Sequence, residues 1–177
     1  MRKAIVGVAL GGLMLLGPKQ AQAFPQTFNL FFSGAQEVGH AGDPDATATG
    51  TLTVDDVLDK LSWNINYTNL DGTSINGFHI HGPGATSTIE KPVFIGLGTS
   101  GTPTLPSGNL TGELTGDASF ALQLDQILAD PGGFYLNIHT VPEFGGGAIR
   151  SALVPEPASL TLFTTAALGL LARRRRH

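Results

Sequence analysis

The feature that most constrains the fold is a strict two-residue alternation near the middle of the chain. From 61 to 67 the sequence reads LSWNINY, so every odd position is apolar or aromatic and every even position is polar. From 47 to 53 every odd position is threonine, and the even positions are small or apolar. This is the period of a β-strand with one buried face. The chain is therefore predicted to be all-β.

About eight short strands with glycine-rich turns favour an antiparallel β-sandwich or barrel. The fold expected is a single antiparallel β-sandwich, either Ig-like or superoxide-dismutase-like. The strands are expected at 27–32, 46–54, 61–67, 77–81, 92–97, 109–114, 134–140 and 148–153. One helix is expected at 124–129, where a Pro-Gly-Gly sequence ends it. The side chains expected in the core are Trp63, Ile65, Phe78, Ile80, Phe94, Leu136 and Ile138.

Residues 1–23 have the pattern of a secretory signal peptide. Two basic residues follow Met1, and the apolar run at 4–16 is shorter than the roughly 20 residues that span a membrane. Ala21 and Ala23 form the small-x-small site that signal peptidase cleaves. The mature chain is therefore predicted to begin at Phe24.

The C-terminal segment 154–177 combines a proline-rich motif (154–159, VPEPAS), an apolar stretch (160–172) and a basic end (173–177). An apolar stretch followed by arginines is a stop-transfer pattern, with the arginines on the cytoplasmic side. The segment resembles the PEP-CTERM sorting signal of Gram-negative bacteria, whose box is Val154, Pro155, Glu156 and Pro157. The resemblance implies a transient C-terminal membrane segment in the inner membrane, recognition by an exosortase, and release to the cell surface or its matrix. An ordinary C-terminal anchor is the alternative.

Between the two ends lies one expected domain, 24–153, which is strongly acidic. It holds thirteen acidic residues against Lys60, Lys91 and Arg150, a formal net charge of −10 with histidine neutral. Nucleic acid is excluded as a partner, because phosphate binding needs clustered lysine and arginine. The chain has no cysteine, which excludes disulfides, thiolate metal sites and cysteine nucleophiles.

Five segments of this domain resemble, in order, the motifs of the CHRD domain, a module named after chordin. They are 32–38 (FSGAQEV), 47–50 (TATG), 77–83 (GFHIHGP), 134–140 (FYLNIHT) and 147–153 (GAIRSAL). Two positions depart from the family pattern, since Gly39 replaces an expected proline and Ala148 an expected glutamate. The resemblance implies a sandwich-like extracellular domain and no settled activity.

Three histidines on two expected strands form a candidate metal site. His79 and His81 share one face of their strand, because side chains alternate, and their Cα atoms are expected about 6.5 Å apart. His139 joins them if its strand is a neighbour. Three imidazoles without thiolate suit Zn or Cu. The alternative is that these histidines are hydrogen-bonded sheet residues, with Asn137 or Glu143 as partners.

Residues 77–81 also resemble the copper-binding strand of Cu/Zn superoxide dismutase, and 146–150 loosely resemble its closing arginine segment. That enzyme's other metal-ligand loop and its cysteine pair have no counterpart here. Arg150 is expected to form a structural ion pair, with Glu143, Glu37 or Glu113 as its partner. The alternative is that Arg150 binds an anion.

Two classes of function follow from these features. The leading hypothesis is a non-enzymatic surface or matrix protein, a binding or adhesion module whose partner is a surface polysaccharide or protein. No assembled set of catalytic residues is visible in the sequence, which favours this hypothesis. The alternative is a Zn- or Cu-binding protein or metalloenzyme that uses His79, His81 and His139.

Overall fold

The computed structural model describes residues 25–98, 101–104 and 107–153. The expected signal peptide (1–23) with its cleavage site and the expected sorting tail (154–177) lie outside the described residues. Within these residues no helix is long and apolar enough to cross a membrane.

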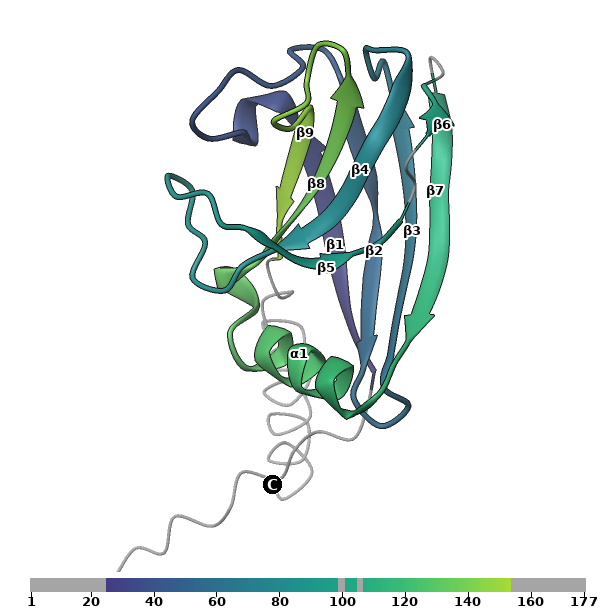
Figure 1. Cartoon of the computed structure of the whole chain (residues 1–177), viewed down its shortest axis with the longest axis vertical. Helices are drawn as coiled ribbons and strands as arrows, with labels where there is room; N and C mark the ends of the chain where they lie inside the picture. Colours follow the sequence, from purple (N-terminus) through teal and green to yellow (C-terminus); the bar gives the residue numbers. More distant parts are fainter. Residues whose placement is uncertain (1–24, 99–100, 105–106, 154–177) are drawn as a thin grey trace, which may run out of the picture.

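The described strands form one antiparallel sheet in the order β5-β4-β8-β9-β1-β2-β3-β7, with β6 paired to β4 beside this path (Figure 1). The strands are β1 (Gln26–Ser33), β2 (Thr47–Asp55), β3 (Lys60–Thr68), β4 (Ser74–His81), β5 (Val93–Gly96), β6 (Thr102–Pro103), β7 (Ser107–Thr115), β8 (Tyr135–Val141) and β9 (Ile149–Ala152). The prediction of an antiparallel, mostly β fold is confirmed.

The sandwich itself is not confirmed, because the two halves of the expected sandwich are joined into one sheet. The junction is a short pairing of β9 with β1, where Arg150 lies opposite Ser33. The sheet then curls into a half-barrel, so that β3 and β4 face each other across the interior. The rings of Trp63 on β3 and Phe78 on β4 meet edge to face at 6.1 Å. Sequence alternation marks the buried face of each strand, and this face is the same for a sandwich and for a curled sheet.

The concave face of the sheet holds the hydrophobic core. Six of the seven side chains expected there are buried, and Phe94 is partly buried against the same cluster. The buried six are Trp63, Ile65, Phe78, Ile80, Leu136 and Ile138. The core therefore lies where the period-two pattern predicted it.

The one α-helix of the described residues, α1 (Ala118–Ala129), lies across one end of the curled sheet (Figure 1). It begins six residues earlier than the apolar pattern predicted, because the Asp117 side chain caps it by accepting hydrogen bonds from the N–H groups of Ser119 and Phe120. Leu124 and Ile127 are fully buried against the core. The short 3-10 helices η1 (Gly34–Gln36) and η2 (Pro131–Gly133) complete the described elements.

Candidate metal centre

The two strands that carry the histidines, β4 and β8, are direct neighbours in the sheet. His79 lies opposite Asn137, His81 opposite Tyr135, and Gly77 opposite His139. All of these face away from the core, because the alternating residues Phe78, Ile80, Leu136 and Ile138 are the buried apolar ones. The pairing that the sequence analysis assumed is therefore present.

The three imidazoles converge on one point of this outer face. One ring nitrogen from each of His79, His81 and His139 lies within 4.8 Å of the other two. The ring centroids of His79 and His139 are 5.1 Å apart, and that of His81 is 5.7 Å from each. His79 is half-buried, whereas His81 and His139 are only 7% and 9% exposed.

Backbone carbonyl groups determine which ring nitrogen of His81 and which ring nitrogen of His139 is free to bind a metal. Nδ1 of His81 lies 2.8 Å from the carbonyl oxygen of Lys91, and Nδ1 of His139 lies 3.1 Å from that of Gly145. A carbonyl only accepts, so each Nδ1 carries the hydrogen and each Nε2 keeps a lone pair. Both Nε2 atoms, and Nδ1 of His79, are buried without a hydrogen-bond partner. A ring held through one nitrogen with the other free is the usual arrangement of a metal-binding histidine.

Burial keeps the three imidazoles neutral. It lowers the pKa of His81 to about 4, and it lowers the pKa values of His79 and His139, where neighbouring histidines add to the effect. Neutral imidazole is the form that binds metal, so the cluster is in its ligand form at neutral pH.

Gly77 makes room for the ring of His79. A Cβ atom at this position would lie 2.5 Å from Cε1 of His79, well inside van der Waals contact. The Gly-Phe-His sequence thus allows the His79 ring to fold back along β4 towards His139, which lies opposite Gly77.

A layer of loops covers this outer face and buries further polar groups. Glu37, which follows η1, accepts a hydrogen bond from Asn137 at 3.3 Å, and burial raises the pKa of Glu37 to about 7. Buried atoms without a hydrogen-bond partner gather here: Glu37 Oε1, His79 Nδ1, His81 Nε2, Asn137 Oδ1 and His139 Nε2. Such atoms are rare in folded proteins, and a group of them indicates a place for a ligand or ion.

The expected ion pair between Arg150 and Glu143 is not found. Glu143 is exposed in the turn between β8 and β9, whereas Arg150 lies flat over the ring of Tyr135, its Cζ 3.5 Å from the ring centroid. Its Nη2 donates to the carbonyl oxygen of Thr86 at 2.7 Å. Glu113, another expected partner, pairs with Lys60.

Several residues of the site were not identified from the sequence. The carbonyl groups of Lys91 and Gly145 leave no sequence signal, because any residue supplies a carbonyl. Tyr135 could have been found, since it alternates with Asn137 and His139 on β8 and stacks on His81 at 4.8 Å. Its hydroxyl also donates to the Lys91 carbonyl that holds His81.

A second group of close acidic side chains, Asp43, Asp45 and Asp71, lies in the loops before β2 and before β4. The oxygens of the buried Asp43 carboxyl accept hydrogen bonds from the N–H groups of Ala46 and Asp71. These two hydrogen bonds explain the buried position of Asp43, because its carboxyl links the loop before β2 to the loop before β4.

Fold and site together define a mostly β half-barrel with a buried histidine cluster on its outer face. The CHRD domain family matches residues 28–153, and the PEP-CTERM protein-sorting motif matches residues 153–176. The chain therefore belongs to the CHRD domain family and carries a PEP-CTERM sorting signal. The sorting motif implies an exported, cell-surface protein that an exosortase processes. No curated protein and no solved structure matches the chain.

Proposed function

We propose that this surface protein binds one Zn or Cu ion through His79, His81 and His139. The observation that carries the proposal is the convergence of three ring nitrogens within 4.8 Å. Around a tetrahedral zinc at about 2.0–2.1 Å, ligand nitrogens lie about 3.3 Å apart. To bind zinc, the ring nitrogens of the three histidines therefore have to approach one another by about 1.5 Å or less. Small rotations of the rings are enough for this.

The chemistry of the ligand set supports the choice of metal. Three neutral imidazoles without thiolate or carboxylate suit Zn or Cu rather than Ca or Mg. Three protein ligands leave a fourth position for water or an external ligand. The same set therefore serves a metal carrier or a metalloenzyme.

Metal analysis of the full chain tests the proposal. We expect about one Zn or Cu per chain after incubation with each metal and desalting. The variants His81→Ala and His139→Ala should lose the metal, and His40→Ala, which changes a histidine outside the cluster, should retain it. A folded wild-type chain that retains neither metal would overturn the proposal.

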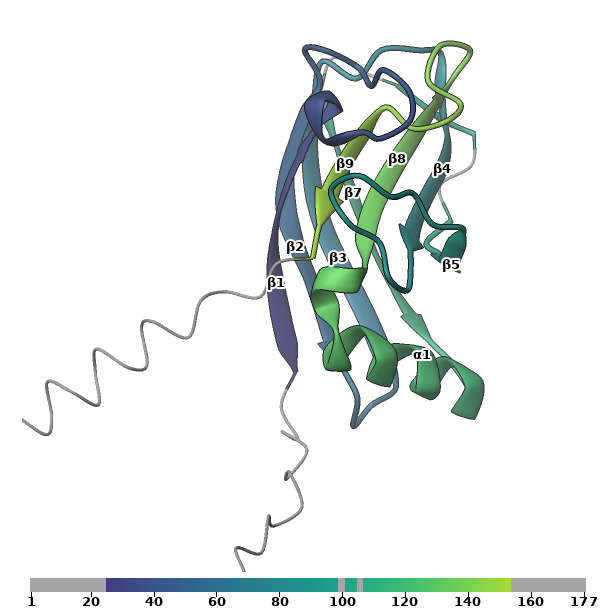
Figure 2. The same ribbon diagram turned by 90° about the vertical axis from the view of Figure 1, so that its left-hand side faces the viewer.

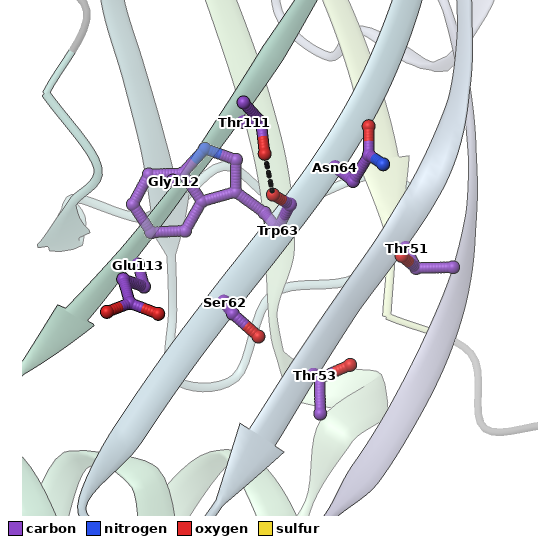
Figure 3. A pocket seen from close by; sticks show the side chains of 8 residues that line it. All are labelled: Thr51, Thr53, Ser62, Trp63, Asn64, Thr111, Gly112 and Glu113. Atoms are coloured by element: carbon purple, nitrogen blue, oxygen red, sulfur yellow. Dashed lines mark hydrogen bonds between the residues drawn. The ribbon is translucent and has the colours of Figure 1, made fainter.

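We further propose that the opposite half of the sheet is an adhesion surface for a neutral polysaccharide. Strands β2, β3 and β7 present rows of hydroxyl and amide side chains in register, such as Thr51–Asn64–Thr111. They line an open depression of about 350 Å³ (Figure 3), together with Thr53, Ser62, Trp63, Gly112 and Glu113. Hydroxyl and amide groups exchange hydrogen bonds with sugars without requiring charge.

An exposed aromatic ring on the same face supports this second proposal. Phe31 on β1 is 68% exposed and lies in register with Thr49 on β2. Aromatic rings offer flat apolar area with little conformational entropy, and sugar rings stack on such surfaces.

Retention of the full chain on insoluble cellulose tests the adhesion surface. Phe31→Ser should weaken retention, whereas Leu58→Ser should not, because Leu58 is 65% exposed in the turn between β2 and β3 and outside the depression. Equal retention of both variants would count against this role and leave the metal proposal untouched.

A further inference from the structure

Arg150 is a buried cation without an ion-pair partner among the described residues. It is 4% exposed, and arginine side chains carry a positive charge in proteins. The two described ion pairs, His40–Glu90 and Lys60–Glu113, do not include it. The buried Glu37 carboxyl, the third expected partner, interacts electrostatically with Arg150 but forms no ion pair with it. A buried charge without a direct ion-pair partner is costly, so its retention calls for an explanation.

The contacts of Arg150 satisfy only part of its guanidinium. The group lies over the Tyr135 ring and donates from Nη2 to the carbonyl oxygen of Thr86. Its Nη1 is buried and has no hydrogen-bond partner. Stacking and one carbonyl hold the guanidinium plane in a fixed orientation, and they leave donor capacity for an anion.

Arg150 also lines a cavity of about 280 Å³. The cavity lies between η1, η2, β9 and the segment that joins β4 to β5, which Figure 2 shows in front of β8 and β9. The other lining residues are Ala35, Gln36, Ala85, Thr86, Ser87, Gly132, Phe134 and Ala152. None of them is charged, so the guanidinium supplies the only formal charge on the cavity wall.

We propose that this cavity binds the carboxylate of a small ligand, about the size of one sugar or amino-acid residue. A planar carboxylate matches the planar fork of arginine. A phosphate dianion fits less well, because a single cation would balance half of its charge. The alanine and phenylalanine side chains give the cavity apolar walls for the rest of the ligand.

This site is separate from the histidine cluster. Tyr135 lies between the two, since His81 and Arg150 both stack on its ring and come from the strands on either side of β8. The carboxylate can come from a uronic acid in an acidic polysaccharide or from the C-terminus of a peptide. Both sources present the same group to Arg150.

Calorimetric titration of the full chain distinguishes the sources. We expect glucuronate or N-acetylalanine to bind, and their uncharged counterparts, glucose and N-acetylalanine amide, not to bind. The tighter of the two carboxylates identifies the source. Three results would overturn the proposal: no carboxylate binding at about 10 mM, a ligand concentration that detects even weak sites; equal binding of glucose and glucuronate; or tighter binding of inorganic phosphate than of either carboxylate.

Two variants connect the binding to this cavity. Ala35→Trp places a large ring at an exposed position of the cavity wall and leaves Arg150 intact, so it should abolish carboxylate binding. Ala118→Trp, an equal change at the exposed start of α1, should have no effect. Arg150→Lys keeps the charge but loses the fork, and should weaken binding about tenfold, as expected for one charged hydrogen bond. Wild-type affinity in Ala35→Trp would overturn the assignment to this cavity.

Discussion

At the scale of single residues, the arrangement of the histidine cluster depends on the missing side chain of Gly77. We predict that Gly77→Ala displaces the His79 ring, because the new Cβ would lie 2.5 Å from its Cε1. The ring is the far end of a flexible side chain, so the fold should tolerate the change. Metal affinity should fall about tenfold or more, as when other positioning contacts of metal ligands are lost. Competition with a colorimetric zinc chelator measures it.

Gly96→Ala is the matched control for that variant. Gly96 lies opposite His79 on β5, and a Cβ there would meet nothing within 4 Å. We expect its metal affinity to equal that of the wild type. If Gly77→Ala and Gly96→Ala lose metal affinity equally, then metal binding does not depend on the position of the His79 ring.

The burial of the cluster also shifts the pH at which metal binding should be lost. Protonation competes with the metal, and in model peptides it does so below about pH 6.5. Because burial lowers the pKa of His81 to about 4 and lowers those of His79 and His139, the competition should begin at lower pH. The midpoint of Zn loss after desalting should therefore lie below pH 6.5. Half-loss near pH 6.5 in a chain with unchanged circular dichroism would contradict this.

At the scale of the elements, α1 covers one open end of the half-barrel and is held there by a narrow apolar stripe. Leu124 is fully buried, whereas Leu122, two residues earlier in the same helix, is 62% exposed. Leu124→Ala should lower the free energy of unfolding by about 2–5 kcal/mol, and Leu122→Ala should change it by about 0.5 kcal/mol or less. Urea denaturation followed by fluorescence measures both. Similar effects of the two substitutions would mean that α1 is not packed as described.

At the scale of the whole molecule, the sequence predicted which face of each strand is buried but not how the strands are joined. Alternation identifies Trp63 and Phe78 as core residues whichever strands are neighbours. The β9–β1 junction, by contrast, rests on a pairing between residues 33 and 150, which local pattern does not encode. For the same reason the sequence identified the three histidines, and the pairing of β4 with β8 that unites them had to be assumed.

The outer layer was less predictable still, because it is made of loops. The loop that follows β4 supplies the carbonyl groups that hold His81 and Arg150, and backbone groups carry no residue-type signal. An arginine in an acidic domain suggests an ion pair, but Arg150 is held by an aromatic ring and a carbonyl instead. The residue types indicated that Arg150 and His81 form polar contacts. Which groups they contact follows only from the tertiary fold.

Targeting and folding reside in different parts of the chain, so they should respond to different changes. The CHRD match ends at 153, where the sorting-motif match begins, and the last described strand, β9, ends at Ala152. We predict that the exported protein begins at Phe24 and lacks the arginines at 173–176. Intact mass and N-terminal sequencing of protein recovered from the cell surface measure both ends. Retention of 1–23 would contradict the first half of the prediction, and retention of the arginines the second.

His81→Ala should reach the surface with the same two ends as the wild type, whereas a chain that ends at 153 should fold and bind metal yet lack surface sorting.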